Sequence, residues 1–333
     1  MIQGGAVNSM WGALFPGQGS QSVGMGRFLF DEFQTARRLF EEAADTLKTD
    51  FRKLCFEGPD SDLQLTENTQ PALLLVSTVT HRVVKEIMPI KIAAAAGHSI
   101  GEYAALVAAE SLEFPMALRA VRKRGQAMQA AVPVGQGAMC AVLGLGDEAV
   151  QKLCKLVVEQ SGESPLEPAN FNSPGQVVVS GSAKAVEWMK QNVTAEWVSE
   201  NLGASAGRAK LIPLSVSAPF HCSLMKPAEL EMRKVLEATT FSSPRFPVVQ
   251  NINAQSTQDT NEIRERLIGQ ISGSVLWTQC QQNLLDQGLH RYVEFGGGKV
   301  LSGLAKKIAG DKARVSNLNS LVDLKALEAL VEV

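Results

Sequence analysis

Short apolar runs alternate with longer amphipathic segments through most of the chain. The short runs have the length of buried strands, and the longer segments repeat their apolar positions at helical spacing. This pattern predicts an α/β architecture with a mostly parallel sheet. In the first part of the chain we expect strands over residues 11–15 and 92–96, and helices over residues 26–48, 71–87, 100–109 and 115–131. Pro71 suits the first turn of its helix.

The order of the elements changes between residues 137 and 216. Here the pattern predicts strands over residues 138–143, 166–171, 176–180 and 209–216, and helices over residues 147–160 and 183–193. This βαββαβ order is the ferredoxin-like pattern, a compact unit with its own small core. The glycine-rich stretch of residues 201–207 is expected to be a loop.

After His221 the α/β pattern resumes. We expect a helix to about residue 238, a strand over residues 248–252, a helix from residue 261 and a strand over residues 291–295. Both flanks of the middle segment therefore contribute to one sheet. The sequence predicts a large α/β domain of residues 1–136 and 217–333, into which a small ferredoxin-like subdomain of residues 137–216 is inserted.

Composition and charge exclude several classes of protein. The chain has 32 basic and 34 acidic residues, whereas a nucleic-acid binder usually shows a basic excess. It has no apolar run of about 18 residues, so no membrane span is expected, and residues 1–10 have the character of a short tail, not of a signal peptide. Five scattered cysteines without a CxxC pair fit reduced thiols in a cytoplasm and argue against a zinc site. We expect a cytoplasmic enzyme without a metal centre.

The sequence Gly97-His98-Ser99-Ile100-Gly101 lies directly between a predicted strand and a predicted helix. Small residues let the backbone turn sharply, which lifts the serine hydroxyl clear of the sheet, and the N-terminus of the helix faces any negative charge that develops there. An exposed serine in an ordinary turn is the alternative. The context favours a nucleophile elbow with Ser99 as the nucleophile, in a large domain that is α/β-hydrolase-like.

A serine nucleophile needs a base, and the chain has four histidines. His98 is a neighbour on a tight turn and points in a different direction, and His81 and His290 are expected at the surface. His221 follows a predicted strand end and a proline, which places it at the same carboxyl edge of the sheet as Ser99. We expect His221 to be the base; a histidine that caps a helix is the alternative.

Arg124 is the one charge on the apolar stripe of the predicted helix over residues 115–131. The stripe consists of Ala117, Ala120, Val121, Arg124, Ala127, Met128 and Ala131. An inward guanidinium is costly unless it meets an anion. Two anions remain open here: a buried carboxylate in a structural salt bridge, or a substrate carboxylate held by two hydrogen bonds.

A second glycine-rich loop, Pro16-Gly17-Gln18-Gly19-Ser20-Gln21, follows the first predicted strand. It lacks the spacing of the phosphate-binding loops. Its glycines let backbone N–H groups approach another part of a site closely. Beside a serine nucleophile, the loop could provide a second oxyanion donor.

Together these motifs resemble the malonyl-CoA:acyl carrier protein transacylase family, the acyltransferases of fatty acid and polyketide synthesis. The resemblance covers about residues 10 to 320. Matching stretches lie at residues 15–21, 97–103, 124–125, 137–139, 170–176, 219–221 and 296–301. Their combination is far more specific than the motif around the serine alone.

The resemblance implies a ping-pong reaction. Malonyl-CoA would acylate Ser99 after His221 removes its proton, and the phosphopantetheine thiol of an acyl carrier protein would then take the malonyl group. The chain would act as a monomer without a cofactor of its own, and backbone carbonyls would orient the histidine in place of an acid. The implied supporting residues are Gln18 and Ile100 as backbone oxyanion donors, Arg124 for the malonyl carboxylate, Gln270 for orienting the histidine and Phe220 for malonyl specificity.

Two features depart from the family's pattern. Gly296-Gly297-Gly298 stands in place of Gly-Pro-Gly, which loosens that loop, and residues 195–208 look longer than typical, which leaves the docking of the carrier protein open. The sequence also leaves open a fatty acid or a polyketide pathway, and transfer or hydrolysis. A non-catalytic docking scaffold is disfavoured because Ser99, His221 and Arg124 are all present.

Overall fold

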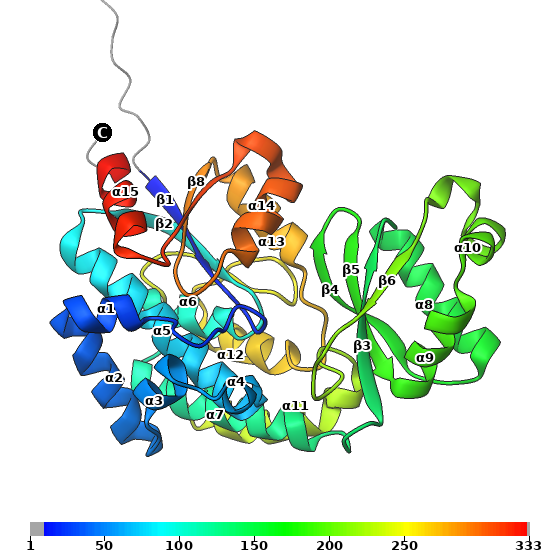
Figure 1. Ribbon diagram of the computed structural model, residues 1–333, viewed down its shortest axis with the longest axis horizontal. Helices are drawn as coiled ribbons and strands as arrows, with labels where there is room; N and C mark the ends of the chain where they lie inside the picture. Colours follow the sequence, from blue (N-terminus) through cyan, green and yellow to red (C-terminus); the bar gives the residue numbers. More distant parts are fainter. Residues whose placement is uncertain (1–9, 332–333) are drawn as a thin grey trace, which may run out of the picture.

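The computed structural model describes residues 10–331, so the tail expected over residues 1–10 lies outside the described residues except for Met10. Two separate sheets organise the protein (Figure 1). A five-stranded parallel sheet forms from the two ends of the chain, and a four-stranded antiparallel sheet forms from its middle. The mixed α/β class expected from the sequence is confirmed.

The parallel sheet has the strand order β7-β2-β1-β8-β9. Its strands are β1 (Met10–Phe15), β2 (Lys91–Gly97), β7 (Val248–Val249), β8 (Arg291–Glu294) and β9 (Arg314–Asn317). Since all five run in the same direction, the loops after β1 and β2 emerge side by side at one edge. In open α/β sheets this carboxyl edge is where ligands bind.

Side chains of the central strands alternate between two apolar cores. In β1, Ala13 and Phe15 belong to the larger core, while Leu14 belongs to the core on the other face. In β2, Ala95 and Ala96 divide in the same way. Because helices cover both faces, these strands are buried along most of their length and exposed only at their first residues, Met10 and Lys91, which explains why they are nearly continuous apolar runs in the sequence.

Helices α5, α6 and α7 pack on the side of the larger core, and α13 and α14 on the other side. The α-helices that precede and follow the antiparallel sheet in the sequence are α1 (Arg27–Glu32), α2 (Gln34–Leu47), α3 (Phe51–Phe56), α4 (Asp60–Gln64), α5 (Thr66–Ile87), α6 (Gly101–Ala108), α7 (Phe114–Ala130), α11 (Lys226–Glu237), α12 (Thr260–Gly269), α13 (Trp277–Asp286), α14 (Val300–Ala309) and α15 (Leu321–Val331).

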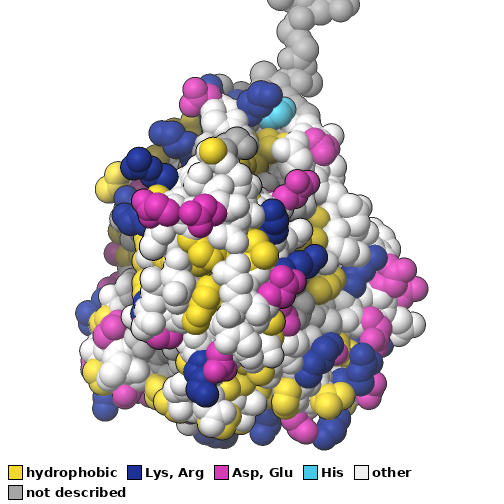
Figure 2. All heavy atoms as spheres, turned by 90° about the vertical axis from the view of Figure 1, so that its right-hand side faces the viewer, with side chains coloured by type: hydrophobic (Ala, Val, Ile, Leu, Met, Phe, Trp, Pro, Cys, Tyr) yellow, Lys and Arg dark blue, Asp and Glu magenta, His cyan; other side chains and the backbone are white. Residues whose placement is uncertain are grey.

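The antiparallel sheet has the order β4-β5-β3-β6 and carries its own core. Its elements are β3 (Gly137–Leu143), α8 (Asp147–Ser161), β4 (Leu166–Ser173), β5 (Gln176–Ser182), α9 (Ala183–Asn192), α10 (Ala195–Leu202) and β6 (Lys210–Pro213). The chain thus follows the predicted order, with α10 added before the last strand. On the face that this unit presents, basic and acidic side chains are interspersed (Figure 2).

Several boundaries differ from the sequence-based expectations. The helix expected over residues 26–48 is two helices, because Phe33 is extended (φ −112°, ψ 129°). Helix α5 begins at Thr66, so Pro71 lies in its second turn and not in its first. The loop expected over residues 201–207 begins after α10 ends at Leu202.

Short strands and the last quarter of the chain were the hardest parts to predict. The strand expected over residues 209–216 ends at Pro213, and the one over residues 248–252 has two residues. Helices α3, α4, α13, α14 and α15 and strand β9 were not predicted. In the described part of the chain, no helix is long and apolar enough to cross a membrane, and no group of three or more potential metal ligands is found.

Glu294 connects the end of β8 to α14. This fully buried carboxylate accepts hydrogen bonds from the backbone N–H groups of Leu301 (3.0 Å) and Ser302 (3.0 Å), and from the Asn317 amide (2.8 Å). Two of these donors are free N–H groups of the first turn of α14, so the carboxylate replaces a conventional cap.

Candidate active site

Ser99 lies at the junction of β2 and α6, in a turn that excludes side chains on both sides. A Cβ atom on Gly97 would lie 2.0 Å from the carbonyl of Gly101, and one on Gly101 would lie 2.1 Å from the backbone oxygen of Phe15. Ser99 itself has a φ of 51°, a conformation that costs a non-glycine residue free energy. The sharp turn expected from the two glycines is therefore present.

Asn251 fixes this turn from the side of β7. Its side-chain oxygen accepts the backbone N–H of Ser99 (2.7 Å), and its amide nitrogen donates to the carbonyl of Gly97 (2.8 Å). Because the side chain is fully buried, both hydrogen bonds form away from water. They hold the strained backbone in the one geometry that presents the hydroxyl.

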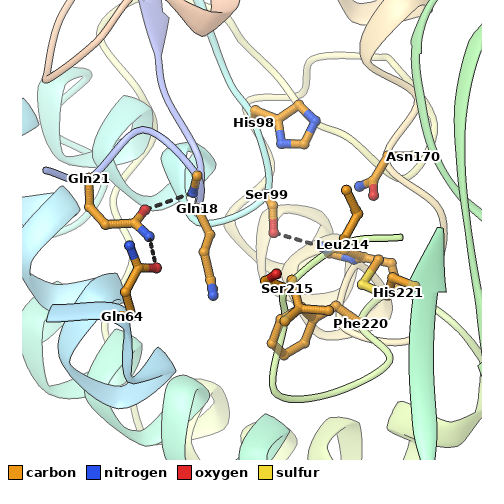
Figure 3. Close-up of a pocket in the computed structure, with 13 residues that line it drawn as sticks. Gln18, Gln21, Gln64, His98, Ser99, Asn170, Leu214, Ser215, Phe220 and His221 are labelled. Atoms are coloured by element: carbon orange, nitrogen blue, oxygen red, sulfur yellow. Dashed lines mark hydrogen bonds between the residues drawn. The ribbon is translucent and has the colours of Figure 1, made fainter. Parts of the chain in front are cut away.

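The Ser99 hydroxyl faces His221, with 2.7 Å between its oxygen and Nε2 (Figure 3). On the other side of the ring, Nδ1 lies 2.9 Å from the carbonyl oxygen of Gln270 and 3.2 Å from that of Gly273. A carbonyl only accepts hydrogen bonds, so Nδ1 carries the proton and Nε2 is the free base. No acidic side chain contacts the ring within the described residues.

His221 reaches this position by a different route from the one expected. The strand before it, β6, belongs to the antiparallel sheet and ends at Pro213, so the argument that placed His221 at the carboxyl edge of the parallel sheet was wrong. The turn after that strand, together with a φ of 59° at His221, carries the imidazole back to Ser99. The pairing was predicted correctly, for an incorrect reason.

Burial lowers the pKa of His221 from 6.5 to about 3, and the charge of Arg124 lowers it further, while the two carbonyl hydrogen bonds oppose this shift. The imidazole is therefore neutral at physiological pH. A neutral imidazole is the form that can accept a proton from a hydroxyl.

Arg124 is 1% exposed and directs its guanidinium at the same hydroxyl. One terminal nitrogen donates to Ser99 Oγ (3.1 Å) and to the side-chain oxygen of Gln270 (2.9 Å), and the other donates to the side-chain oxygen of Gln70 (3.0 Å). Its Nε has no partner among the described residues. All three acceptors are neutral, so within residues 10–331 the structural salt bridge left open by the sequence does not form.

Gln270 contributes to the site in two ways. Its backbone carbonyl orients His221, and its fully buried side chain lies between Arg124 and Glu102. The sequence-based expectation covered only the first contact.

A cavity of about 300 Å³ opens over Ser99 between the two units. The parallel-sheet unit contributes Gln18, Gly19, Gln21, Gln64, His98, Ser99, Phe220 and His221, and the segments around the antiparallel sheet contribute Met139, Asn170, Leu214, Ser215 and Val216. Among the described residues no charged side chain lines this cavity, so Arg124 lies behind its wall.

The expected oxyanion donors flank the nucleophile. Gln18 lines the cavity, and Ile100 follows Ser99 at the start of α6. Neither backbone N–H donates to another protein group among the described residues, so both are available to an oxyanion. Phe220 is buried and contributes to the cavity wall beside His221 (Figure 3).

The remaining histidines do not reach the Ser99 hydroxyl. Nε2 of His98 lies 2.8 Å from the side-chain oxygen of Asn172 in β4, which links the two units. His81 was expected at the surface, but it is 5% exposed and packs against Phe15 and Phe295. Burial lowers its pKa to about 4.

Four residues of the site were not singled out from the sequence: Gln70, Glu102, Asn251 and Asn172. The first three are buried polar residues in apolar surroundings, the same signal that identified Arg124. Gln70 and Asn251 follow other polar residues in the sequence, whereas Glu102 is flanked by Gly101 and Tyr103 and carries the same signal as Arg124. Asn172 contacts His98 across the two units. Local sequence patterns carry no information about a contact between such distant segments.

Comparison with known proteins places the chain in a family. Residues 13–295 match the model of the acyl transferase domain. A relative from Bacillus subtilis strain 168, malonyl CoA-acyl carrier protein transacylase, is 44% identical over 295 residues, which is 89% of each chain. The crystal structure of an acyl carrier protein S-malonyltransferase from Vibrio cholerae is 41% identical with a TM-score of 0.88, covering 95% of this chain and 99% of that chain. A malonyl-transacylase in complex with a type II polyketide acyl carrier protein is 38% identical with a TM-score of 0.87, covering 96% and 99%.

The lowered pKa of His221 predicts an unusual pH profile for the reactivity of Ser99. Because the imidazole gains a proton only as the pH falls through about 3, the rate of labelling by a serine-directed fluorophosphonate should show no midpoint between about pH 5 and pH 8. Labelling can be followed by mass spectrometry, with circular dichroism to confirm that the protein remains folded. A midpoint near 6.5 would show that the imidazole is not desolvated as the structure has it.

Proposed function

The chain belongs to the acyl transferase family, and from this premise we propose that it transfers the malonyl group of malonyl-CoA to the phosphopantetheine thiol of an acyl carrier protein, in fatty acid synthesis. The observation that carries the proposal is that a nucleophile and a base line one cavity, while a buried guanidinium behind its wall donates to the same hydroxyl. Ser99 and His221 are common to serine hydrolases, whereas Arg124 selects a substrate with a free carboxylate.

The first half of the reaction forms a malonyl ester on Ser99. Nε2 of His221 takes the hydroxyl proton as the oxygen attacks the thioester carbonyl, and the backbone N–H groups of Gln18 and Ile100 receive the resulting oxyanion. As the tetrahedral intermediate collapses, the imidazolium returns the proton to the sulfur of coenzyme A. The carbon–sulfur bond breaks and the ester remains.

The second half repeats the same steps with a different thiol. His221 removes the proton of the phosphopantetheine thiol, the thiolate attacks the ester carbonyl, and the proton passes to the Ser99 oxygen when the ester bond breaks. Since both halves use one base and one oxyanion hole, the two thiols occupy the same cavity in turn. The reaction needs no cofactor of this chain; phosphopantetheine belongs to the carrier protein.

Arg124 holds the malonyl carboxylate during both halves. In the structure its guanidinium donates to amide and hydroxyl oxygens. A carboxylate is a stronger hydrogen-bond acceptor for a guanidinium than either of these groups. When the carboxylate arrives, the contact with Ser99 is released and the hydroxyl is left to His221. Binding of the correct substrate thus also prepares the nucleophile.

Two alternatives use the same residues. The type II polyketide carrier protein in the complex of the 38% identical relative makes a polyketide carrier the second candidate acceptor for a free-standing acyltransferase. An acyl hydrolase would pass the ester to water instead of a thiol. Rapid release of coenzyme A without loading of any carrier protein would identify hydrolysis.

We also propose the finer description of the fold. The strand order β4-β5-β3-β6 and the separate core support a ferredoxin-like subdomain over residues 137–216, inserted into an α/β-hydrolase-like domain of residues 1–136 and 217–333. Since the proposed substrates are coenzyme A esters and carrier proteins, we propose that the protein acts in the cytoplasm, and we propose a monomer because one chain supplies every residue assigned to the site.

Intact-mass measurement of the protein after incubation with acyl-CoAs tests the function directly. Malonyl-CoA should add about 86 Da, the mass of one malonyl ester, and addition of a phosphopantetheinylated carrier protein should remove it and load the carrier. The Ser99→Ala variant should gain no mass. An unmodified wild-type protein, or an ester that only water removes, would contradict the proposal. Parallel reactions with fatty acid and polyketide carrier proteins decide between the two acceptors.

Replacement of Arg124 by alanine should separate charged from uncharged acyl groups. Truncating one partner of a buried charge pair costs about 2–5 kcal/mol, so malonyl acylation should fall by at least about 30-fold, while acetyl acylation is retained or improved. The rates of ester formation from malonyl-CoA and acetyl-CoA give the ratio. Equal losses for the two substrates would show that Arg124 does not bind the carboxylate.

Phe220→Ala should relax the specificity for the unbranched malonyl group. The aromatic ring fills the cavity wall beside His221, so its removal makes room for a methyl branch, an effect worth about 10-fold or more in selectivity. Competition between methylmalonyl-CoA and malonyl-CoA, read by intact mass, measures it. If the ratio does not change, Phe220 does not set specificity.

A further inference from the structure

A second charged group lies behind the nucleophile. Glu102, in the first turn of α6, is fully buried. Its oxygens accept from the backbone N–H of Asn251 (2.8 Å), from the amide of Gln250 (3.0 Å) and from the amide of Gln270 (2.9 Å). All three partners are donors, which is the pattern that an ionised carboxylate requires. Burial raises the pKa of Glu102, and these hydrogen bonds and the charge of Arg124 oppose that rise.

The two buried charges do not touch. No ion pair within 4.0 Å joins Glu102 to Arg124 in the described part of the chain. The side-chain amide of Gln270 lies between them, donating to Glu102 (2.9 Å) and accepting from Arg124 (2.9 Å). One neutral amide therefore separates a carboxylate from a guanidinium.

Gln270 can adopt only one orientation in this place. Its amide nitrogen also donates to the carbonyl of Ser99 (3.1 Å) and lies 3.4 Å from the side-chain oxygen of Asn251. Every group on this side is an acceptor, so the nitrogen must face them and the oxygen must face Arg124. The orientation would persist even if the charge of Glu102 were removed.

We propose that Glu102 is the buried counter-ion of Arg124, and that Gln270 is the spacer that prevents the two from pairing. The carboxylate thereby offsets the buried positive charge in the absence of substrate, and the guanidinium remains without a directly bonded carboxylate. This inference rests on the proposed function, since it assigns Arg124 to a substrate carboxylate. Glu102 and the side chain of Gln270 are positioning residues that act through Arg124.

Removing the Glu102 carboxylate and moving it next to Arg124 should change substrate binding in opposite directions. A carboxylate one amide away from Arg124 stabilises the empty site and also repels the incoming substrate carboxylate, because like charges interact strongly in a buried site. Removing it should strengthen the binding of a charged acyl group. Moving the carboxylate into direct contact with Arg124 should occupy the N–H donors of the guanidinium and weaken the binding of a charged acyl group.

The test measures binding without turnover in the Ser99→Ala background. Calorimetry gives the Kd of malonyl-CoA and of acetyl-CoA, and the ratio of the two isolates the effect of the carboxylate. Addition of Glu102→Gln should raise the preference for malonyl-CoA by about 5-fold or more. The transposed variant, Glu102→Gln with Gln270→Glu, conserves composition and net charge and should reduce the preference to about one.

Glu294→Gln is the matched control. Glu294 is equally buried and also accepts backbone N–H groups, but its partners lie in α14 and β9 and include neither Arg124 nor Gln270. Its replacement should leave the preference unchanged. Far-ultraviolet circular dichroism checks the fold, and if the single Glu102 variant does not fold, the charge-conserving transposed variant decides.

Three results are distinguishable. If both Glu102 variants change the two Kd values by the same factor, Glu102 is only a structural support of the turn, and the inference is overturned. A lower preference for malonyl-CoA in the Glu102→Gln variant would also overturn it, because the counter-ion would then assist substrate binding. If the Ser99→Ala parent shows no preference at all, the proposed function fails instead.

Discussion

The turn at Ser99 exists only because three stretches of backbone meet there without side chains between them. Gly97 and Gly101 leave no room for a Cβ, and the oxygen of Phe15, at the end of β1, closes the gap from the neighbouring strand. This contact brings the loop that carries Gln18 next to the nucleophile. The oxyanion hole and the nucleophile are thus products of one packing constraint, which follows from the parallel pairing of β1 and β2.

Behind this turn the protein manages buried charge by distributing it over polar neighbours. Arg124 and Glu102 are both buried, yet neither bonds to the other: amide and hydroxyl oxygens accept from Arg124, and amide N–H groups donate to Glu102. Asn251 and Gln270 each bond to both the turn and the carboxylate. The strain of the Ser99 backbone and the cost of the buried charges are therefore met by one hydrogen-bonded network.

The sequence predicted what local patterns determine. The glycine spacing predicted the turn at Ser99, and helical periodicity placed Arg124 inward, because both signals depend on a few neighbouring residues. The position of His221 depends on the path of β6, which belongs to the antiparallel sheet. His221 therefore lies beside Ser99 as expected, but not because it follows a strand of the parallel sheet. The roles of Glu102 and Asn251 depend on contacts between distant segments, with sequence separations of 149 and 152 residues. The spacing of apolar residues along the chain carries no information about such long-range contacts.

The carbonyl partners of His221 have a kinetic consequence. An acid at Nδ1 would stabilise the imidazolium, but the carbonyls of Gln270 and Gly273 offer only dipoles, and the ring shares its surroundings with a charged guanidinium. The protonated ring is therefore short-lived and returns its proton to whichever sulfur or oxygen is leaving. Each step is then readily reversible. An enzyme that exchanges one thioester for another of similar free energy brings the two to equilibrium, and its direction is set by the concentrations of both thiols and both thioesters and not by the site.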